Sequence, residues 1–156
     1  MGVSALPSES ELMEFLNHEG PHEVISALPE GEDGPIESAA SQLGIPFRRA
    51  GLSDSEILDL FAQHVSFIDL LRLNRRRKKL AKRMRKEVVP IREQERYLRK
   101  VGGYRRFEEA REREIASRIG ALRGRAVVFV DAELAEGVAA LLESFKTAPP
   151  LTPEGR

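Results

Sequence analysis

The 156-residue chain has no cysteine and no tryptophan, and its aromatic residues are limited to seven phenylalanines and two tyrosines. The lack of cysteine excludes disulfides and thiolate metal sites, and is typical of a reducing compartment. No apolar run approaches the roughly 20 residues that span a bilayer, and the acidic N-terminus lacks the apolar core of a signal peptide. We therefore expect a soluble, cytoplasmic protein without a membrane partner.

Motifs for cofactor binding are also scarce. The chain has no phosphate loop of the G-x-x-x-x-G-K-[ST] type and no glycine-rich dinucleotide fingerprint. Residues 127–133, VVFVDAE, resemble the magnesium-binding strand end of ATPases that carry such a loop. A strand followed by Asp131 as a helix cap explains the same residues, so we expect no cofactor.

Residues 18–22, HEGPH, match the H-E-x-x-H pattern of zinc peptidases. That chemistry needs both histidines and the glutamate on one helix. Gly20 favours the end of a helix, and Pro21 would clash with the preceding turn. We therefore predict a turn between a helix and a strand, with no metal site and no catalytic residue.

Charged residues are abundant in this sequence, and acidic and basic residues are concentrated in different segments. Lysine and arginine number 25, aspartate and glutamate number 25, and the formal net charge is zero. Residues 1–71 nevertheless carry a net charge of −11, and residues 72–106 carry +13. The densest run is residues 75–86, RRRKKLAKRMRK, with nine bases and no acid. Because like charges repel at i, i+4 spacing on a helix, this run indicates an anionic partner.

Apolar spacing and turn residues predict an α+β, mostly α-helical fold: a compact small mixed body with a long central helix and a projecting basic helical arm. Residues 1–52 are predicted to form a small acidic α/β module. Ser8 and Glu11 make a capping box for its first helix, which Gly20 ends. A strand, a small helix and an extended segment follow, over residues 22–28, 35–43 and 45–51.

Ser53 and Glu56 make a second capping box ahead of the longest helix, which is predicted from residue 54 to about 88, roughly 50 Å at 1.5 Å per residue. Its first half carries an apolar stripe that should face the core: Ile57, Leu60, Phe61, Val65, Ile68 and Leu71. In its second half, Leu73, Leu80 and Met84 share a narrow arc. Bases fill most of the remaining circumference, and we call these residues the basic face: Arg72, Arg75, Arg76, Lys78, Lys79, Lys82, Arg83, Arg85 and Lys86.

Pro90 ends this helix, and a short helix with Leu98 and Val101 inward should follow. Gly102 and Gly103 permit a reversal into another helix, so that residues 53–125 comprise the long helix plus a basic helical hairpin or coiled arm. A strand and helix over residues 126–147 complete the body. The buried face of that helix is predicted to consist of Leu134, Val138, Leu141, Leu142 and Phe145, and residues 148–156 are expected to form a flexible tail.

The main functional hypothesis is a non-enzymatic nucleic-acid-binding protein, of regulatory or packaging type, whose basic face contacts the phosphate backbone of DNA or RNA. The alternative is an oligomeric adaptor or scaffold whose basic arm docks on an acidic protein surface, including that of a neighbouring copy. We expect a homo-oligomer. Aromatic residues near the basic run are limited to Tyr97 and Tyr104. Binding of single strands by base stacking is therefore the weaker form of the nucleic-acid hypothesis.

An enzymatic interpretation comes from residues 100–114, KVGGYRRFEEARERE. This segment resembles the part of all-helical chorismate mutases where a lysine, a loop, an acidic residue and an Arg–Glu pair line the active site. The resemblance implies that Lys100, Glu108, Arg111 and Glu112 would hold these positions. Pro90 interrupts the long arginine-bearing helix that precedes the lysine in that family, so this interpretation ranks third.

Overall fold

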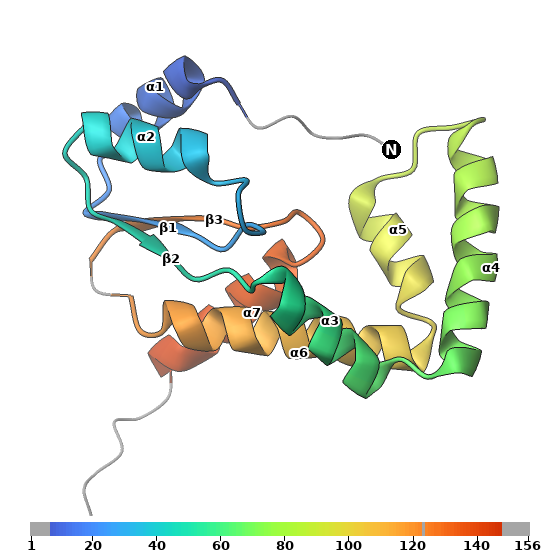
Figure 1. Cartoon of the computed structure of the whole chain (residues 1–156). Coiled ribbons are helices and arrows are strands. Elements are labelled where there is room, and N and C mark those ends of the chain that lie inside the picture. Colours follow the sequence, from blue (N-terminus) through green and yellow to red (C-terminus); the bar gives the residue numbers. More distant parts are fainter. Residues whose placement is uncertain (1–6, 123, 148–156) are drawn as a thin grey trace, which may run out of the picture.

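The computed structural model describes residues 7–122 and 124–147. Within them the chain forms seven helices and one three-stranded sheet (Figure 1). The helices are α1 (Glu9–Glu19), α2 (Gly34–Gln42), α3 (Asp54–His64), α4 (Phe67–Met84), α5 (Ile91–Leu98), α6 (Gly102–Ile119) and α7 (Ala135–Thr147). The strands are β1 (Glu23–Ser26), β2 (Phe47–Arg49) and β3 (Ala126–Phe129). The predicted mostly helical α+β body is confirmed; the predicted tail lies outside the described residues.

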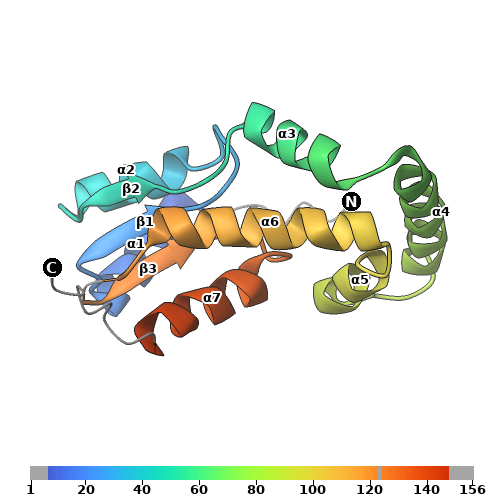
Figure 2. The same ribbon diagram turned by 90° about the horizontal axis from the view of Figure 1, so that it is seen from below.

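The sheet is parallel, with the strand order β2-β1-β3. Helices α1 and α2 cover one face, and α6 and α7 cover the other (Figures 1 and 2). Because side chains alternate along a strand, Val24 points toward α1 and α2 while Ile25 joins the opposite layer. The segment 126–147 therefore completes the same sheet as the N-terminal module rather than standing beside it.

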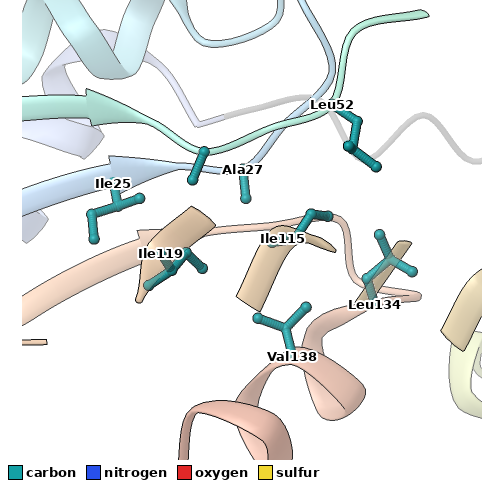
Figure 3. Packing of buried hydrophobic residues seen from close by; sticks show 8 residues of the cluster. Ile25, Ala27, Leu52, Ile115, Ile119, Leu134 and Val138 are labelled. Atoms are coloured by element: carbon teal, nitrogen blue, oxygen red, sulfur yellow. The ribbon is translucent and has the colours of Figure 1, made fainter. Parts of the chain in front are cut away.

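The larger core lies between the sheet and helices α6 and α7 (Figure 3). Ile115 and Ile119 of α6 pack against Ile25, while Leu134 and Val138 close the layer from the other side. All of these side chains are almost completely buried. A cap at Asp131 would start the last helix at Ala132, but α7 starts three residues later, at Ala135. Phe145, predicted to be buried, is exposed.

The predicted helix over residues 54–88 is wrong in one respect, because it is two helices. Val65 adopts an extended conformation and ends α3, and Ser66 caps α4 in a capping box with Asp69. The turn rotates the following residues away from the body. As a result Ile68, predicted in the core, is 60% exposed, and Leu71 is exposed as well. Ile57, Leu60, Phe61 and Val65 are half-buried, and Phe61 packs edge-on against Phe107.

Helices α4 and α5 form a hairpin at the end of α6 that lies away from the sheet (Figures 1 and 2). Leu73 and Leu80 of α4 are buried there against Leu98, Val101 and Phe107. The predicted inward positions of Leu98 and Val101 are confirmed. Gly102 and Gly103 form the first turn of α6 rather than a loop before it. No helix in residues 7–122 and 124–147 is long and apolar enough to cross a membrane.

Gly51, in the loop between β2 and α3, provides a test of this packing. An added Cβ would overlap the carbonyl oxygen of Leu28, which is backbone and cannot rotate away. We expect Gly51→Ala to lower the free energy of unfolding by about 1–3 kcal/mol in urea titrations. Gly34→Ala is the matched control, because nothing lies within 4 Å of its added Cβ and it begins a helix. Equal losses in the two variants would contradict the close approach.

Candidate functional site

The basic face covers the exposed surface of α4 and the turn that follows it. Of its nine residues, eight are exposed and Arg76 is half-buried. Arg85 caps the end of α4 and Lys86 lies in the following turn, so both continue the row of bases beyond the helix. Within the described residues only Arg83 among the nine forms ion pairs, with Glu87 and, at 2.6 Å, with Glu93. Most of this positive charge is therefore not neutralised inside the chain.

The acidic first half of the chain pairs with other bases. Its described ion pairs join Glu23 to Arg48, Asp33 and Glu37 to Arg49, Glu56 to Arg118, and Glu19 to Arg125. The helix α1, which exposes Glu9, Glu11 and Glu14, lies at the far end of the molecule from α4 (Figure 1). The exposed acids of α1 are thus separated in space from the basic face, whereas Asp69, the last acid of the acidic half, lies on α4 itself.

Helix α5 adds cations that sequence reasoning did not assign to the basic face. A hollow of about 630 Å³ lies between α4 and the start of α6, and we call it the α4–α5 hollow. Its lining includes Lys100 and Tyr97 in addition to four residues of the basic face. A neighbouring hollow includes Arg92 and Arg96. The spacing of Arg92, Arg96 and Lys100, four residues apart, was the available signal for a second basic row.

Tyr97 contacts one cation from each basic row, Arg76 of α4 and Lys100. The Arg76 guanidinium lies 4.8 Å from the centre of the Tyr97 ring and donates a hydrogen bond of 3.3 Å to the Tyr97 carbonyl oxygen. The Lys100 Nζ lies 6.0 Å from the same ring centre. These cation–π contacts fix the position of charges that would otherwise repel one another.

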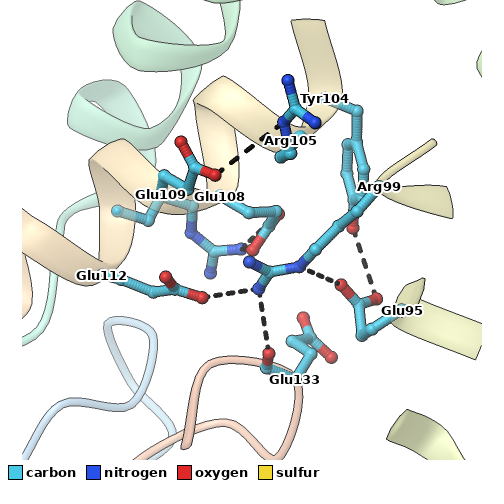
Figure 4. A network of polar contacts seen from close by, with 9 residues as sticks. Glu95, Arg99, Tyr104, Arg105, Glu108, Glu109, Glu112 and Glu133 are labelled. Atoms are coloured by element: carbon cyan, nitrogen blue, oxygen red, sulfur yellow. Dashed lines mark hydrogen bonds and ion pairs between the residues drawn. The ribbon is translucent and has the colours of Figure 1, made fainter. Parts of the chain in front are cut away.

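A second polar cluster is buried between α5, α6 and the loop after β3 (Figure 4). The Arg111 Nη1 atom donates to both carboxylate oxygens of Glu108, at 3.1 and 3.2 Å, and Arg99 donates to Glu112 at 2.5 Å. The Arg99 Nε atom lies 3.5 Å from Glu95, and the Tyr104 hydroxyl donates to Glu95 at 3.4 Å. Two buried atoms, Glu95 Oε2 and Arg111 Nε, have no hydrogen-bond partner among the described residues.

Three of the four positions implied by the resemblance to chorismate mutases, Glu108, Arg111 and Glu112, belong to this buried cluster. Lys100 is exposed and lies over Tyr97, although it lines the same surface pocket as Glu112. Glu108 is only 1% exposed, and the guanidiniums of Arg99 and Arg111 already contact protein carboxylates. The cluster has the geometry of an internal ion-pair network that joins the helices.

The cluster should make stability depend on pH. Burial, followed by the charges of Glu108 and Glu133, raises the pKa of Glu95 to about 7. Burial also raises the pKa values of Glu108 and Asp131. The folded state therefore keeps a proton on Glu95 that the unfolded chain releases near its ordinary pKa of 4.5. The free energy of unfolding should thus fall as the pH rises from about 4.5 to about 7.

Glu95→Gln should be close to wild type in stability at pH 5 and more stable than wild type at pH 8. The expected gain at pH 8 is on the order of 1–3 kcal/mol, measured by urea unfolding across the pH range. Glu109→Gln, on the partly exposed surface 3.9 Å from Arg105, serves as the control. A Glu95→Gln profile parallel to wild type would show that the pKa of Glu95 is the same in the folded and the unfolded chain.

The HEGPH motif does not lie on a single helix. Helix α1 ends at Glu19, and Gly20 has a φ of 56° in the left-handed region, where glycine is favoured. His22 lies beyond the turn, immediately before β1, so His18 and His22 do not share a helix. No group of three metal-binding side chains occurs in the described part of the chain.

Comparisons of the chain with protein-family models, with curated proteins and with solved structures gave no match.

Proposed function

We propose that this protein binds nucleic acid through the phosphate backbone, with the basic face of α4 as its contact surface. The observation that carries the proposal is the charge of the basic face, on α4 and the turn after it, where eight of the nine bases form no ion pair with the described residues. Exposed lysines and arginines that replace condensed counterions on phosphates supply most of the affinity of such proteins. The proposed role is non-enzymatic, regulatory or packaging, in the cytoplasm.

The shape of the surface supports this proposal. From Arg72 to Arg83, the last base within α4, the helical rise is about 16 Å, which equals roughly five base steps of a nucleic-acid strand. The buried side chains of Leu73 and Leu80 hold this length of helix against the α5–α6 end of the molecule. A rigid row of cations can meet several phosphates without the entropy cost of ordering a disordered segment.

The proposed contacts are to phosphate and therefore carry little sequence information. We expect mixed-sequence DNA and RNA to bind with similar affinity at low salt. Fluorescence anisotropy with labelled duplexes and single strands of both kinds measures this directly. Strong preference for one base sequence would require contacts to base edges, which the basic face does not supply in this proposal.

A second candidate has its own supporting observation. The exposed acids of α1 lie at the opposite end of the molecule from the basic face, so that one copy could dock head to tail on the next. Contacts of this kind build rings or filaments rather than closed two-fold dimers. Light scattering on a sizing column separates the two candidates. Salt-sensitive self-association without binding to DNA or RNA would favour an oligomeric adaptor, whereas salt-insensitive stoichiometry with binding would favour the nucleic-acid proposal.

A further inference from the structure

The α4–α5 hollow has a feature that the rest of the basic face lacks, because it is concave and lined by positive charge alone. Its charged side chains are four from α4 and one from the turn before α6: Arg72, Arg75, Arg76, Lys79 and Lys100. No carboxylate is among the residues that line it. Lys78, Lys82 and Arg85 belong to the basic face but do not line the hollow.

We propose that the α4–α5 hollow is a binding site for a phosphate monoester group, such as the phosphorylated end of a nucleic-acid strand. A monoester carries a charge of about −1.5 to −2 at pH 7, whereas a backbone diester carries one negative charge. Five cations that line one hollow therefore favour the monoester, since their attraction grows with the charge of the ligand. Charge-assisted bonds from arginine to phosphate oxygens are among the strongest hydrogen bonds in proteins.

The size and the surroundings of the hollow agree with this ligand. Its volume of about 630 Å³ admits a phosphate together with an attached sugar. Tyr97 lines it, with Arg76 held on its ring and on its carbonyl oxygen, so one wall is already ordered. Gly102, the first residue of α6, also lines the hollow, and the first turn of that helix has neither an acidic residue nor a side-chain cap. The Asp69 carboxylate of α4 lies against Gly103 in this turn and already meets the positive end of the helix, so the five side chains supply the positive potential of the hollow.

This inference rests on the proposed function but can fail separately from it. The test uses the full chain and a short single strand prepared with a 5′-phosphate, with a 3′-phosphate and with hydroxyls at both ends. We expect one phosphorylated end to bind about tenfold more tightly than the hydroxyl-ended strand in anisotropy titrations. Free nucleoside monophosphate and inorganic phosphate, followed by ¹⁵N NMR, should shift the amide signals of Gly102 and Gly103.

Two matched double variants test whether the hollow causes the preference for a phosphorylated end. Lys79→Ala with Lys100→Ala should remove the advantage of the phosphorylated end. Lys78→Ala with Lys82→Ala should weaken both strands equally and leave their ratio unchanged. Both pairs are exposed, so neither should disturb folding, which circular dichroism checks.

Each outcome distinguishes the monoester site in the hollow from the proposal that the basic face binds the nucleic-acid backbone. If the three strands bind with equal affinity whatever their ends, the hollow is not a monoester site and the backbone proposal stands. The same follows if the Lys78→Ala, Lys82→Ala variant loses the preference for the phosphorylated end. If inorganic phosphate shifts Gly102 but no strand binds, the hollow is a site for a small phosphorylated molecule and the nucleic-acid proposal falls. If neither phosphate nor any strand binds, both are wrong.

Discussion

Replacing Arg75, Lys79, Lys82 and Lys86 with glutamate should abolish most of the binding to nucleic acid while the fold remains intact. All four side chains are exposed, and none forms an ion pair within the described residues. The change removes four cations and adds four anions, so the variant should repel phosphate. If each base neutralises one phosphate, the slope of log K against log salt should become shallower by about 0.9 for each phosphate that is no longer bound.

Anisotropy at low salt measures this loss of affinity, which we expect to exceed about a hundredfold. Two further variants separate the local effect from the change in net charge. The first replaces the same four bases with alanine, which removes four positive charges. The second adds four negative charges elsewhere, as glutamates at exposed positions of α3, α6 and α7: Ala62, Gln63, Ser117 and Ser144. Equal losses in these two variants would mean that overall charge, and not the basic face, governs binding.

The second large effect concerns the attachment of α4. Leu73 is 0% exposed and packs in the cluster that joins α4 to α5 and α6. We expect Leu73→Ala to lower the free energy of unfolding by about 2–5 kcal/mol, because it leaves a cavity where α4 is most deeply buried among the described residues. Urea unfolding followed by circular dichroism measures the loss.

Ile68→Ala is the matched control, since Ile68 lies on the same helix but is 60% exposed. Its expected effect is below about 0.5 kcal/mol. A large loss for Ile68→Ala with a small loss for Leu73→Ala would restore the single long helix that the apolar spacing of residues 54–71 predicts, and would contradict the turn at Val65 and Ser66.

The sequence predicted the local structures whose determinants are close together in the chain. The capping boxes at Ser8 and Ser53 and the end of α1 at Gly20 are confirmed, because each depends on residues within one helical turn. The break before α4 also had a local signal, Ser66 followed by Asp69 three residues later. The apolar spacing continues across this break, however, and by itself predicts one helix with Ile68 and Leu71 in the core.

Other features depend on tertiary packing that no local pattern specifies. The parallel pairing of β3 with β1 joins residues about 100 positions apart, which a short strand cannot signal by itself. The α4–α5 hollow likewise exists because buried Leu80 and Leu98 bring two basic helices together. The nine bases of the basic face were visible in the sequence, but the contribution of Tyr97 and Lys100 required the fold.

The salt dependence of binding by the intact chain tests the central claim most directly. A labelled mixed-sequence duplex is titrated with the full-length protein at several salt concentrations between about 50 and 200 mM, where phosphate contacts weaken steeply. If the basic face lies along the backbone and makes about four to six phosphate contacts, log K should fall linearly against log salt with a slope between about −3.5 and −5.5. The absence of measurable binding to DNA and to RNA at the lowest salt, or an affinity that does not change with salt, would contradict the proposal.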